Sequence, residues 1–163
     1  MVSDTTQLIF FIVVEKIGHF LVMWYMWTTT TLKKTFGLTK LYRELNGKYF
    51  GNSLGDCTIE AVPDPSSYIP AAAVITPRRK RTGGYTANIR FNSRIDWNEK
   101  NIRRVLLHEM IHYYIYVKTG RGLFFPHGLR FIITMLKINL LHGEHIQVYW
   151  HEGKLTWSDG RPR

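Results

Sequence analysis

Cysteine is almost missing from this sequence. Its 163 residues include one cysteine, Cys57. One cysteine cannot close a disulfide within the chain or supply the thiolates of a zinc ribbon, which excludes disulfide-stapled secreted domains and cysteine-based zinc modules. We therefore expect a reducing, cytoplasmic compartment. The alternation of residues 57–62 predicts a strand in which Cys57 packs against the core.

Acidic residues are also few. The chain has 12 Asp and Glu against 22 Lys and Arg, which gives a formal net charge of +10. This excess favours a polyanionic partner, either nucleic acid or lipid headgroups, although charge also serves solubility alone. Two interpretations of the densest positive run remain open: it contacts phosphates, as in single-stranded DNA, or it is a solvated turn at a hairpin tip. The run comprises Arg78, Arg79, Lys80 and Arg81.

Long uninterrupted apolar runs are missing too. Near the N-terminus, residues 8–14 and 20–27 are apolar, but Glu15 and Lys16 lie between them. Read as one span, about fourteen apolar residues at about −0.3 to −0.6 kcal/mol each oppose two central charges at about +2.5 to +3.5 kcal/mol each, so the sum is near zero. Neither run alone is long enough to cross a bilayer, and the first residues lack the basic cluster of a secretory signal.

We divide the chain into an apolar N-terminal extension, residues 1–37, and a compact domain, residues 38–163. The extension has three interpretations: a membrane anchor, an amphipathic or poorly ordered tail, or a stretch that precedes a start of translation at Met23 or Met26. If the segment inserts into a membrane, the lysines that follow it favour keeping the compact domain on the cytoplasmic side.

The compact domain mixes helical and strand periodicity, which is typical of a small α+β fold. Leu41, Leu45 and Tyr49 recur at helical spacing, and Gly51 is expected to end that helix. Strands are expected at residues 57–62, 71–76 and 85–92.

The strand at residues 85–92 has the clearest pattern. Tyr85, Ala87, Ile89 and Phe91 alternate with polar residues, which predicts one buried face and one polar face. The strand leads directly towards the next helix, so we expect it at the edge of a cleft. There it would either pair with an extended substrate by β-augmentation or be an ordinary edge strand.

The helix that follows carries the pattern His108-Glu109-x-x-His112. On an α-helix, residues i and i+4 share one face, so His108 and His112 can direct ring nitrogens at one zinc ion. Glu109 is offset around the helix, where it can act as a general base without being a ligand. Zinc with an open coordination position activates water and polarises a carbonyl group, and this chemistry hydrolyses peptides.

The surroundings of the pattern favour a metal site over two satisfied core histidines. Asp96, with Glu99 three residues later, resembles a capping box and predicts the start of a helix. Apolar residues then cover most of the circumference as far as Gly120, the expected stop. Two histidines and a carboxylate inside such a central helix are costly to bury unless a metal ion satisfies them.

A third ligand has to come from another segment. From His112 the helix continues for about two turns, near 9 Å, and the link to His127 is long enough to return over that distance. His127 is therefore the preferred third ligand. The competitors lie beyond a further helix, and such residues are more often polar surface groups; they are His142, Glu144, His145 and His151.

The chain resembles the SprT-like zinc metalloproteases over about residues 39–141. The order of an H-E-x-x-H motif followed by H-G-x-x-F is more specific than the first motif alone. The stretches that carry the resemblance are residues 41–46 (LYRELN), 49–50 (YF), 84–92 (GYTANIRFN), 107–112 (LHEMIH) and 127–131 (HGLRF).

The resemblance implies a small zincin-like fold, with a short sheet packed on an active-site helix and a second ligand-bearing helix. It implies zinc on His108, His112 and His127, and Glu109 as the general base. Relatives of this kind include proteases that digest proteins crosslinked to DNA and are gated by DNA. The chain departs from the longer members because it lacks their four-cysteine zinc ribbon.

The sequence therefore predicts a monomeric zinc-dependent endopeptidase that acts on protein or peptide substrates near DNA, either single-stranded or crosslinked to protein. The alternative is a non-catalytic basic protein that keeps zinc structurally and binds DNA or a membrane surface. The two locations that we expect are a cytoplasmic one, associated with DNA, and a membrane-anchored one that faces the cytoplasm. Glu109 favours the enzyme, because a structural zinc site needs no general base.

Overall fold

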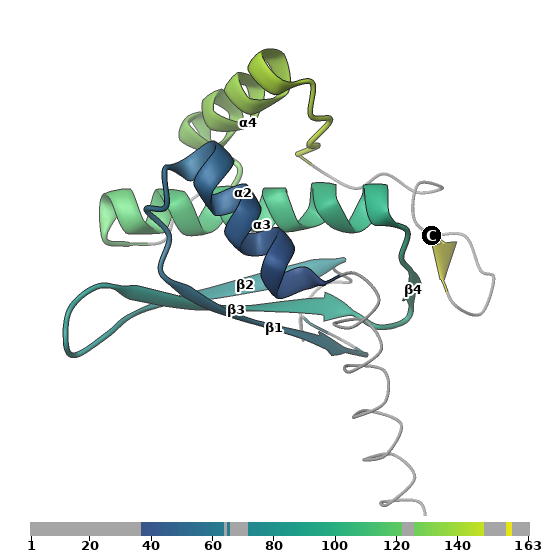
Figure 1. The fold of residues 1–163 in the computed structure, drawn as a ribbon, viewed down its shortest axis with the longest axis horizontal. Helices are drawn as coiled ribbons and strands as arrows, with labels where there is room; N and C mark the ends of the chain where they lie inside the picture. The colour runs from purple at the N-terminus through teal and green to yellow at the C-terminus, as the bar shows by residue number, and fades with distance from the viewer. Residues whose placement is uncertain (1–36, 64, 66–71, 122–125, 149–155, 158–163) are drawn as a thin grey trace, which may run out of the picture.

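The computed structural model describes residues 37–63, 65, 72–121, 126–148 and 156–157. The predicted N-terminal extension, apart from its last residue, and His151 lie outside these residues. The described chain is an α+β domain, as the sequence predicted, with three helices and a short mixed sheet (Figure 1).

The sheet has three strands in the order β1-β3-β2: β1 (Asp56–Val62), β2 (Ala73–Arg79) and β3 (Tyr85–Asn92). β1 pairs with β3 in parallel, and β2 pairs with β3 in antiparallel orientation. Ala87, Ile89 and Phe91 are buried, so one face of β3 belongs to the core and the other carries polar residues.

The expectation that β3 lies at the edge of a cleft is wrong, because β3 is the central strand and has a partner on each side. Alternation reports which faces of a strand are buried, but it carries no information about how many neighbours the strand has. The edge strand that packs against the long helix α3 is β2.

Helix α2 (Leu38–Phe50) buries Leu38, Leu45 and Phe50 and ends where Gly51 adopts a left-handed conformation. This end confirms the predicted stop. The α2 side chain of Asn46 is buried but satisfied, since it donates to the Leu54 carbonyl and accepts from the Leu54 N–H. These two bonds fix the turn that leads from α2 into β1.

Helix α3 (Glu99–Thr119) is the centre of the domain, and ten of its residues are buried. It begins after Asn98, whose side chain accepts a hydrogen bond from the Asn101 N–H at 2.8 Å. The prediction that Asp96 caps this helix is therefore wrong: Asp96 belongs to β4 (Ile95–Asp96), which pairs with β5 (Thr156–Trp157). The predicted stop at Gly120 is confirmed, with a left-handed backbone.

The sheet and the helices form three layers. α2 and α3 cover one face of the sheet, and α4 (Leu129–His142) packs on the side of α3 that faces away from the sheet (Figure 1). Phe131, Met135 and Ile138 are the buried residues of α4. Within the described residues, no helix has the length and apolar character needed to cross a membrane.

Candidate metal centre

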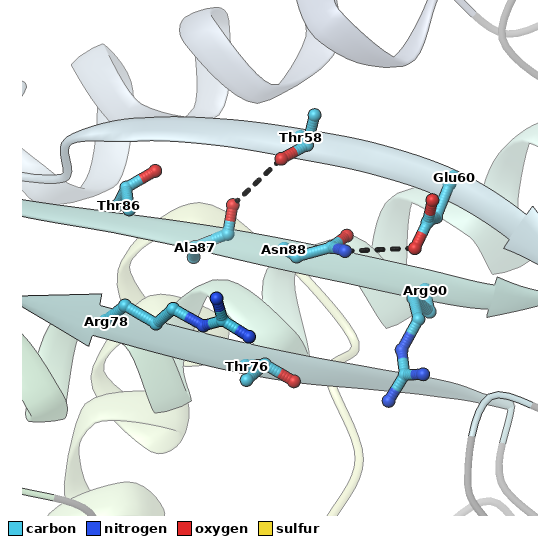
Figure 2. A pocket seen from close by; sticks show the side chains of 8 residues that line it. All are labelled: Thr58, Glu60, Thr76, Arg78, Thr86, Ala87, Asn88 and Arg90. Atoms are coloured by element: carbon cyan, nitrogen blue, oxygen red, sulfur yellow. Dashed lines mark hydrogen bonds between the residues drawn. The ribbon is translucent and has the colours of Figure 1, made fainter.

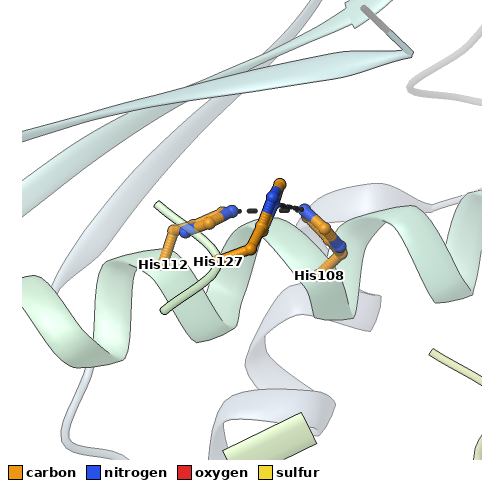
Figure 3. Close-up of side chains that lie close together, drawn as sticks. All are labelled: His108, His112 and His127. Carbon is orange, nitrogen blue, oxygen red and sulfur yellow. Dashed lines mark hydrogen bonds between the residues drawn. The ribbon is translucent and has the colours of Figure 1, made fainter. Parts of the chain in front are cut away.

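His108 and His112 lie one turn apart on α3, as their spacing predicted. Their Nε2 atoms are 3.2 Å apart, so both rings converge on one point (Figure 3). His108 is buried and His112 is half-buried. The geometry is a local property of the helix and needs no other part of the fold.

His127 completes a cluster of three imidazoles. It lies in the turn just before α4, and its Nε2 atom is 3.1 Å from that of His108. The nearest ligand atoms of the three histidines all lie within 4.8 Å of one another, and the group could hold a metal ion. The structure thus brings His127 to the position that the sequence analysis gave it.

The described competitors lie elsewhere. The His142 ring packs edge-on against Tyr49, and His145 is exposed. The Glu144 carboxylate accepts from the Arg103 guanidinium at 2.7 Å and from the Tyr49 hydroxyl. Glu144 therefore joins α2, α3 and the segment after α4.

Phe131 forms the apolar wall of the cluster. Its ring centroid lies 4.8, 4.6 and 4.9 Å from those of His108, His112 and His127. Phe131 is fully buried, so it fixes the three imidazoles against α4. The H-G-x-x-F motif includes this residue, but the sequence alone predicted no role for it.

A backbone carbonyl fixes the tautomer of His108. Nδ1 of His108 lies 2.7 Å from the carbonyl oxygen of Gln147, and a carbonyl can only accept, so Nδ1 carries the proton. Nε2 is then the free nitrogen that faces the other two histidines. Such an outer partner orients a ligating histidine and raises its basicity.

Burial keeps the three imidazoles neutral. It lowers the pKa of His108 to about 4 and that of His112 to about 3, and the neighbouring histidines add to both shifts. Burial also lowers the pKa of His127 below its ordinary value. Neutral imidazoles are the form that binds a metal ion, so no proton has to leave at neutral pH.

Glu109 is buried beside the cluster and is not part of it. Burial raises the pKa of its carboxyl group to about 8, while a hydrogen bond from the backbone of Ile75 in β2 acts in the opposite direction. A carboxyl group whose pKa lies near neutrality can take up and release a proton at physiological pH. The role of Ile75 was missed, because a backbone N–H leaves no signal in the sequence.

The basic run is divided between two environments. Arg78 and Arg79 are the last residues of β2, and Lys80 and Arg81 belong to the turn after it. Nζ of Lys80 lies 2.8 Å from Oδ2 of Asp56 in an exposed ion pair. The predicted hairpin tip therefore begins two residues later than expected.

Arg78 lines a hollow of about 410 Å³ on the polar face of the sheet, turned away from the helices (Figure 2). Arg90 lines the same hollow, and no ion pair holds either guanidinium among the described residues. Between them, the Asn88 side chain donates to Glu60, while its Oδ1 atom has no hydrogen-bond partner in the described part of the chain. The hollow is also lined by Thr58, Thr76, Thr86 and Ala87.

Comparison with known proteins agrees with this arrangement. No curated protein matched the chain in sequence. A sequence model of the SprT-like family matches residues 23–151, a range that includes the three histidines, Glu109 and Phe131. With a match over most of its length, the chain belongs to the SprT-like family.

Proposed function

We propose that this protein is a zinc-dependent endopeptidase. The observation that carries the proposal is the combination of three converging neutral imidazoles with a buried carboxyl group that is not a ligand. His108, His112 and His127 bind the zinc ion, and Glu109 is the general base.

The donor set fits zinc. In a tetrahedral site with Zn–N bonds of about 2.0–2.1 Å, two ligand nitrogens lie about 3.3–3.4 Å apart. The Nε2 atom of His108 lies 3.2 Å from that of His112 and 3.1 Å from that of His127, within a few tenths of an ångström of this value, and all three ligand atoms lie within 4.8 Å of one another. Three neutral nitrogen donors without a thiolate suit zinc among the common divalent ions.

The zinc ion and the residues around it have separate roles in the proposed hydrolysis. Zinc held by three protein ligands supplies a Lewis acid with an open position, which lowers the pKa of water and polarises a carbonyl group. Glu109 takes the proton from the attacking water and then delivers it to the amine that leaves. The Ile75 N–H holds the Glu109 carboxyl group towards the edge of β2. Phe131 excludes water from one side of the histidines.

The free edge of β2 provides a place for the peptide. Antiparallel pairing uses alternate residues, and the bond from the Asn92 N–H to the Ala72 carbonyl sets the phase of the ladder. Ala73 and Ile75 therefore direct their backbone groups away from β3, and the backbone of Ile75 bonds Glu109 of α3. An extended peptide that pairs with this edge passes next to Glu109. β-augmentation thus remains part of the proposal, with β2 in the place that the sequence analysis gave to β3.

The number of ligands argues against the structural alternative. Structural zinc sites normally have four protein ligands. In the described part of the chain, the cluster contains three residues. A structural site also has no use for a buried carboxyl group beside the ligands, whose burial costs free energy.

Glu109→Gln tests this function. The substitution keeps the size of the side chain and leaves the three ligands in place, so we expect zinc content and the circular dichroism spectrum to be unchanged. Casein proteolysis should fall by about two to four orders of magnitude, the usual contribution of a general base. Near-normal turnover by the variant, with one zinc per chain, would leave the hydrolase without its base.

We further propose that a nucleic-acid strand occupies the polar face of the sheet. The support is the pair of guanidinium groups of Arg78 and Arg90 in the hollow, which no ion pair holds within the described residues, together with the net charge of +10. Arg79, Lys80 and Arg81 continue the positive surface beyond the hollow. Proteins attached to such a strand would then be the substrates.

A further inference from the structure

Helix α4 has two apolar faces, and one of them is exposed. The buried face consists of Phe131, Met135 and Ile138. Among the described residues, every large apolar side chain that is exposed belongs to α4, and Leu129 and Leu140 reach 72% and 81% exposure. Four of these side chains recur at intervals of four, three and four residues, the spacing of one stripe along an α-helix. The outer stripe comprises Leu129, Ile133, Leu136 and Leu140.

The charges beside the outer stripe have one sign. Arg130 and Lys137 are exposed and lie seven residues apart, which places both on the same flank of the helix. Helix α4 contains no acidic residue. A groove of about 200 Å³ between α3 and α4 runs beside Ile133 and is bordered by Lys118 and Arg130. Apolar side chains next to cations match an acyl layer beneath anionic headgroups.

Two other occupants fit the outer stripe less well. A second copy of the chain would place Arg130 and Lys137 against the same cations, with no acidic residue on α4 to neutralise them. A folded protein partner would need a groove into which the stripe inserts, because Leu129 and Leu140 project into the solvent. A fluid apolar phase needs no such preformed shape.

We infer that α4 docks the domain on an anionic lipid surface, with the outer stripe in the interface and Arg130 and Lys137 at the level of the headgroups. Helices of this kind lie in the plane of the membrane interface and bind by buried apolar area and by attraction to anionic lipid. The inference concerns the location of the domain and holds whether or not the protein is a protease.

A second apolar stretch lies near the N-terminus of the sequence, outside the described residues. Residues 8–14 and 20–27 are apolar, and their insertion as one span is balanced near zero by Glu15 and Lys16. One weak apolar contact binds a membrane reversibly, and stable attachment generally takes two. If that stretch also meets the membrane, α4 provides the second contact that stable attachment requires.

The test is co-sedimentation of the full chain with vesicles of phosphatidylglycerol and phosphatidylcholine. We expect binding to anionic vesicles and much weaker binding to pure phosphatidylcholine. Replacement of Leu129, Ile133, Leu136 and Leu140 by Gln should lower the partition coefficient by at least about tenfold. Zinc content and circular dichroism should not change, because the substituted side chains are outside the core.

Two double variants that remove the same charge distinguish the effect of where the cations lie from the effect of the net charge of the protein. Arg130→Gln with Lys137→Gln removes two cations beside the outer stripe, and Arg78→Gln with Arg90→Gln removes two from the far side of the molecule. Only the first pair of substitutions should weaken binding to anionic vesicles. Equal losses in both pairs, no vesicle binding by the parent, or unchanged binding by the four-Gln variant would each overturn the inference. So would a parent dimer that the four-Gln variant abolishes, because the occupant would then be a second copy.

A fluorophore reports α4 directly, whatever the N-terminal segment does. In a Cys57→Ser background, the variant Leu140→Cys carries an environment-sensitive label on the outer stripe. Its emission should shift to the blue when anionic vesicles are added. The same label at Arg43→Cys, an exposed position on α2, should not shift. A label at residue 140 that stays in water on bound protein would overturn the inference.

Discussion

The environment, and not the residue type, separates the properties of Glu109 and Glu144. Glu109 is buried, and this burial raises the pKa of its carboxyl group to about 8. Glu144 is also partly buried, but hydrogen bonds from Arg103 and Tyr49 outweigh that burial and lower its pKa. The first carboxyl group can exchange a proton near neutral pH, whereas the second stays charged and holds the structure together.

The third ligand is tested by a pair of histidine variants. His127→Ala removes one of the three converging nitrogens, so zinc retention after dialysis should fall strongly, with about one zinc per chain in the parent. His142→Ala is the matched control, because His142 contacts Tyr49 and lies away from the cluster. Atomic absorption measures both. Stoichiometric zinc in His127→Ala, with loss in His142→Ala, would show that the ligand set is wrong.

The sequence predicted those parts of the site that depend on local geometry. The i, i+4 spacing of His108 and His112 fixes their convergence in any helix, and the short link after α3 brings His127 within reach. The sequence could not predict the carbonyl of Gln147 or the N–H of Ile75. Backbone groups are present at nearly every position, so only the folded chain shows which of them meets a functional side chain.

At the scale of helices and strands, the sequence predicted which faces are buried, but it did not predict which strands pair with each other. Periodicity located α2, α3 and β3 to within a few residues. It did not show that β3 is central, because hydrogen-bonded neighbours lie in the plane of the sheet and leave no alternation. The start of α3 was missed by two residues, since Asp96 and Asn98 are both good caps and pairing with β5 decides between them.

A substitution of Glu144 tests how α2, α3 and the segment after α4 are held together. Glu144→Gln removes the charge that receives bonds from α2 and α3, so the free energy of unfolding at pH 7 should fall by about 1–3 kcal/mol. The folded pKa of Glu144 is lowered, so its contribution is complete above the unfolded pKa of about 4.3 and is lost as the pH falls through the folded pKa. The gap between parent and variant should therefore close below about pH 4.

Urea unfolding of the metal-free proteins between pH 3 and pH 7 measures this gap. The difference between the two proteins cancels the titration of the three histidines, which both contain. Glu44→Gln, at an exposed position on α2, is the matched control and should change the free energy of unfolding by less than about 0.5 kcal/mol. A gap of constant size across the pH range would exclude the ionised Glu144 as its cause.

On the scale of the whole molecule, the layers separate two basic surfaces. The sheet and α4 lie on opposite sides of α3, the helix that carries His108 and His112 of the candidate metal centre (Figure 1). The excess of cations is therefore not a uniform property of the domain. One set of basic residues lines the hollow on the sheet, and another borders the outer stripe.

Because the two basic surfaces are separate, substitutions on the sheet should weaken the binding of nucleic acid, and substitutions beside α4 should not. If Arg78 and Arg90 contact phosphates, the logarithm of the affinity for single-stranded DNA should fall with the logarithm of salt concentration by about 0.7 per phosphate neutralised. Arg78→Gln with Arg90→Gln should then flatten the slope by about 1.4, measured by fluorescence anisotropy. Zinc content and cleavage of a free peptide should stay the same, because neither residue belongs to the candidate metal centre.

The matched control is Arg130→Gln with Lys137→Gln, which removes the same charge near α4 and should leave the slope unchanged. A slope that both pairs flatten equally would reduce the effect to net charge, and no binding by the parent at moderate salt would remove nucleic acid from this face of the sheet.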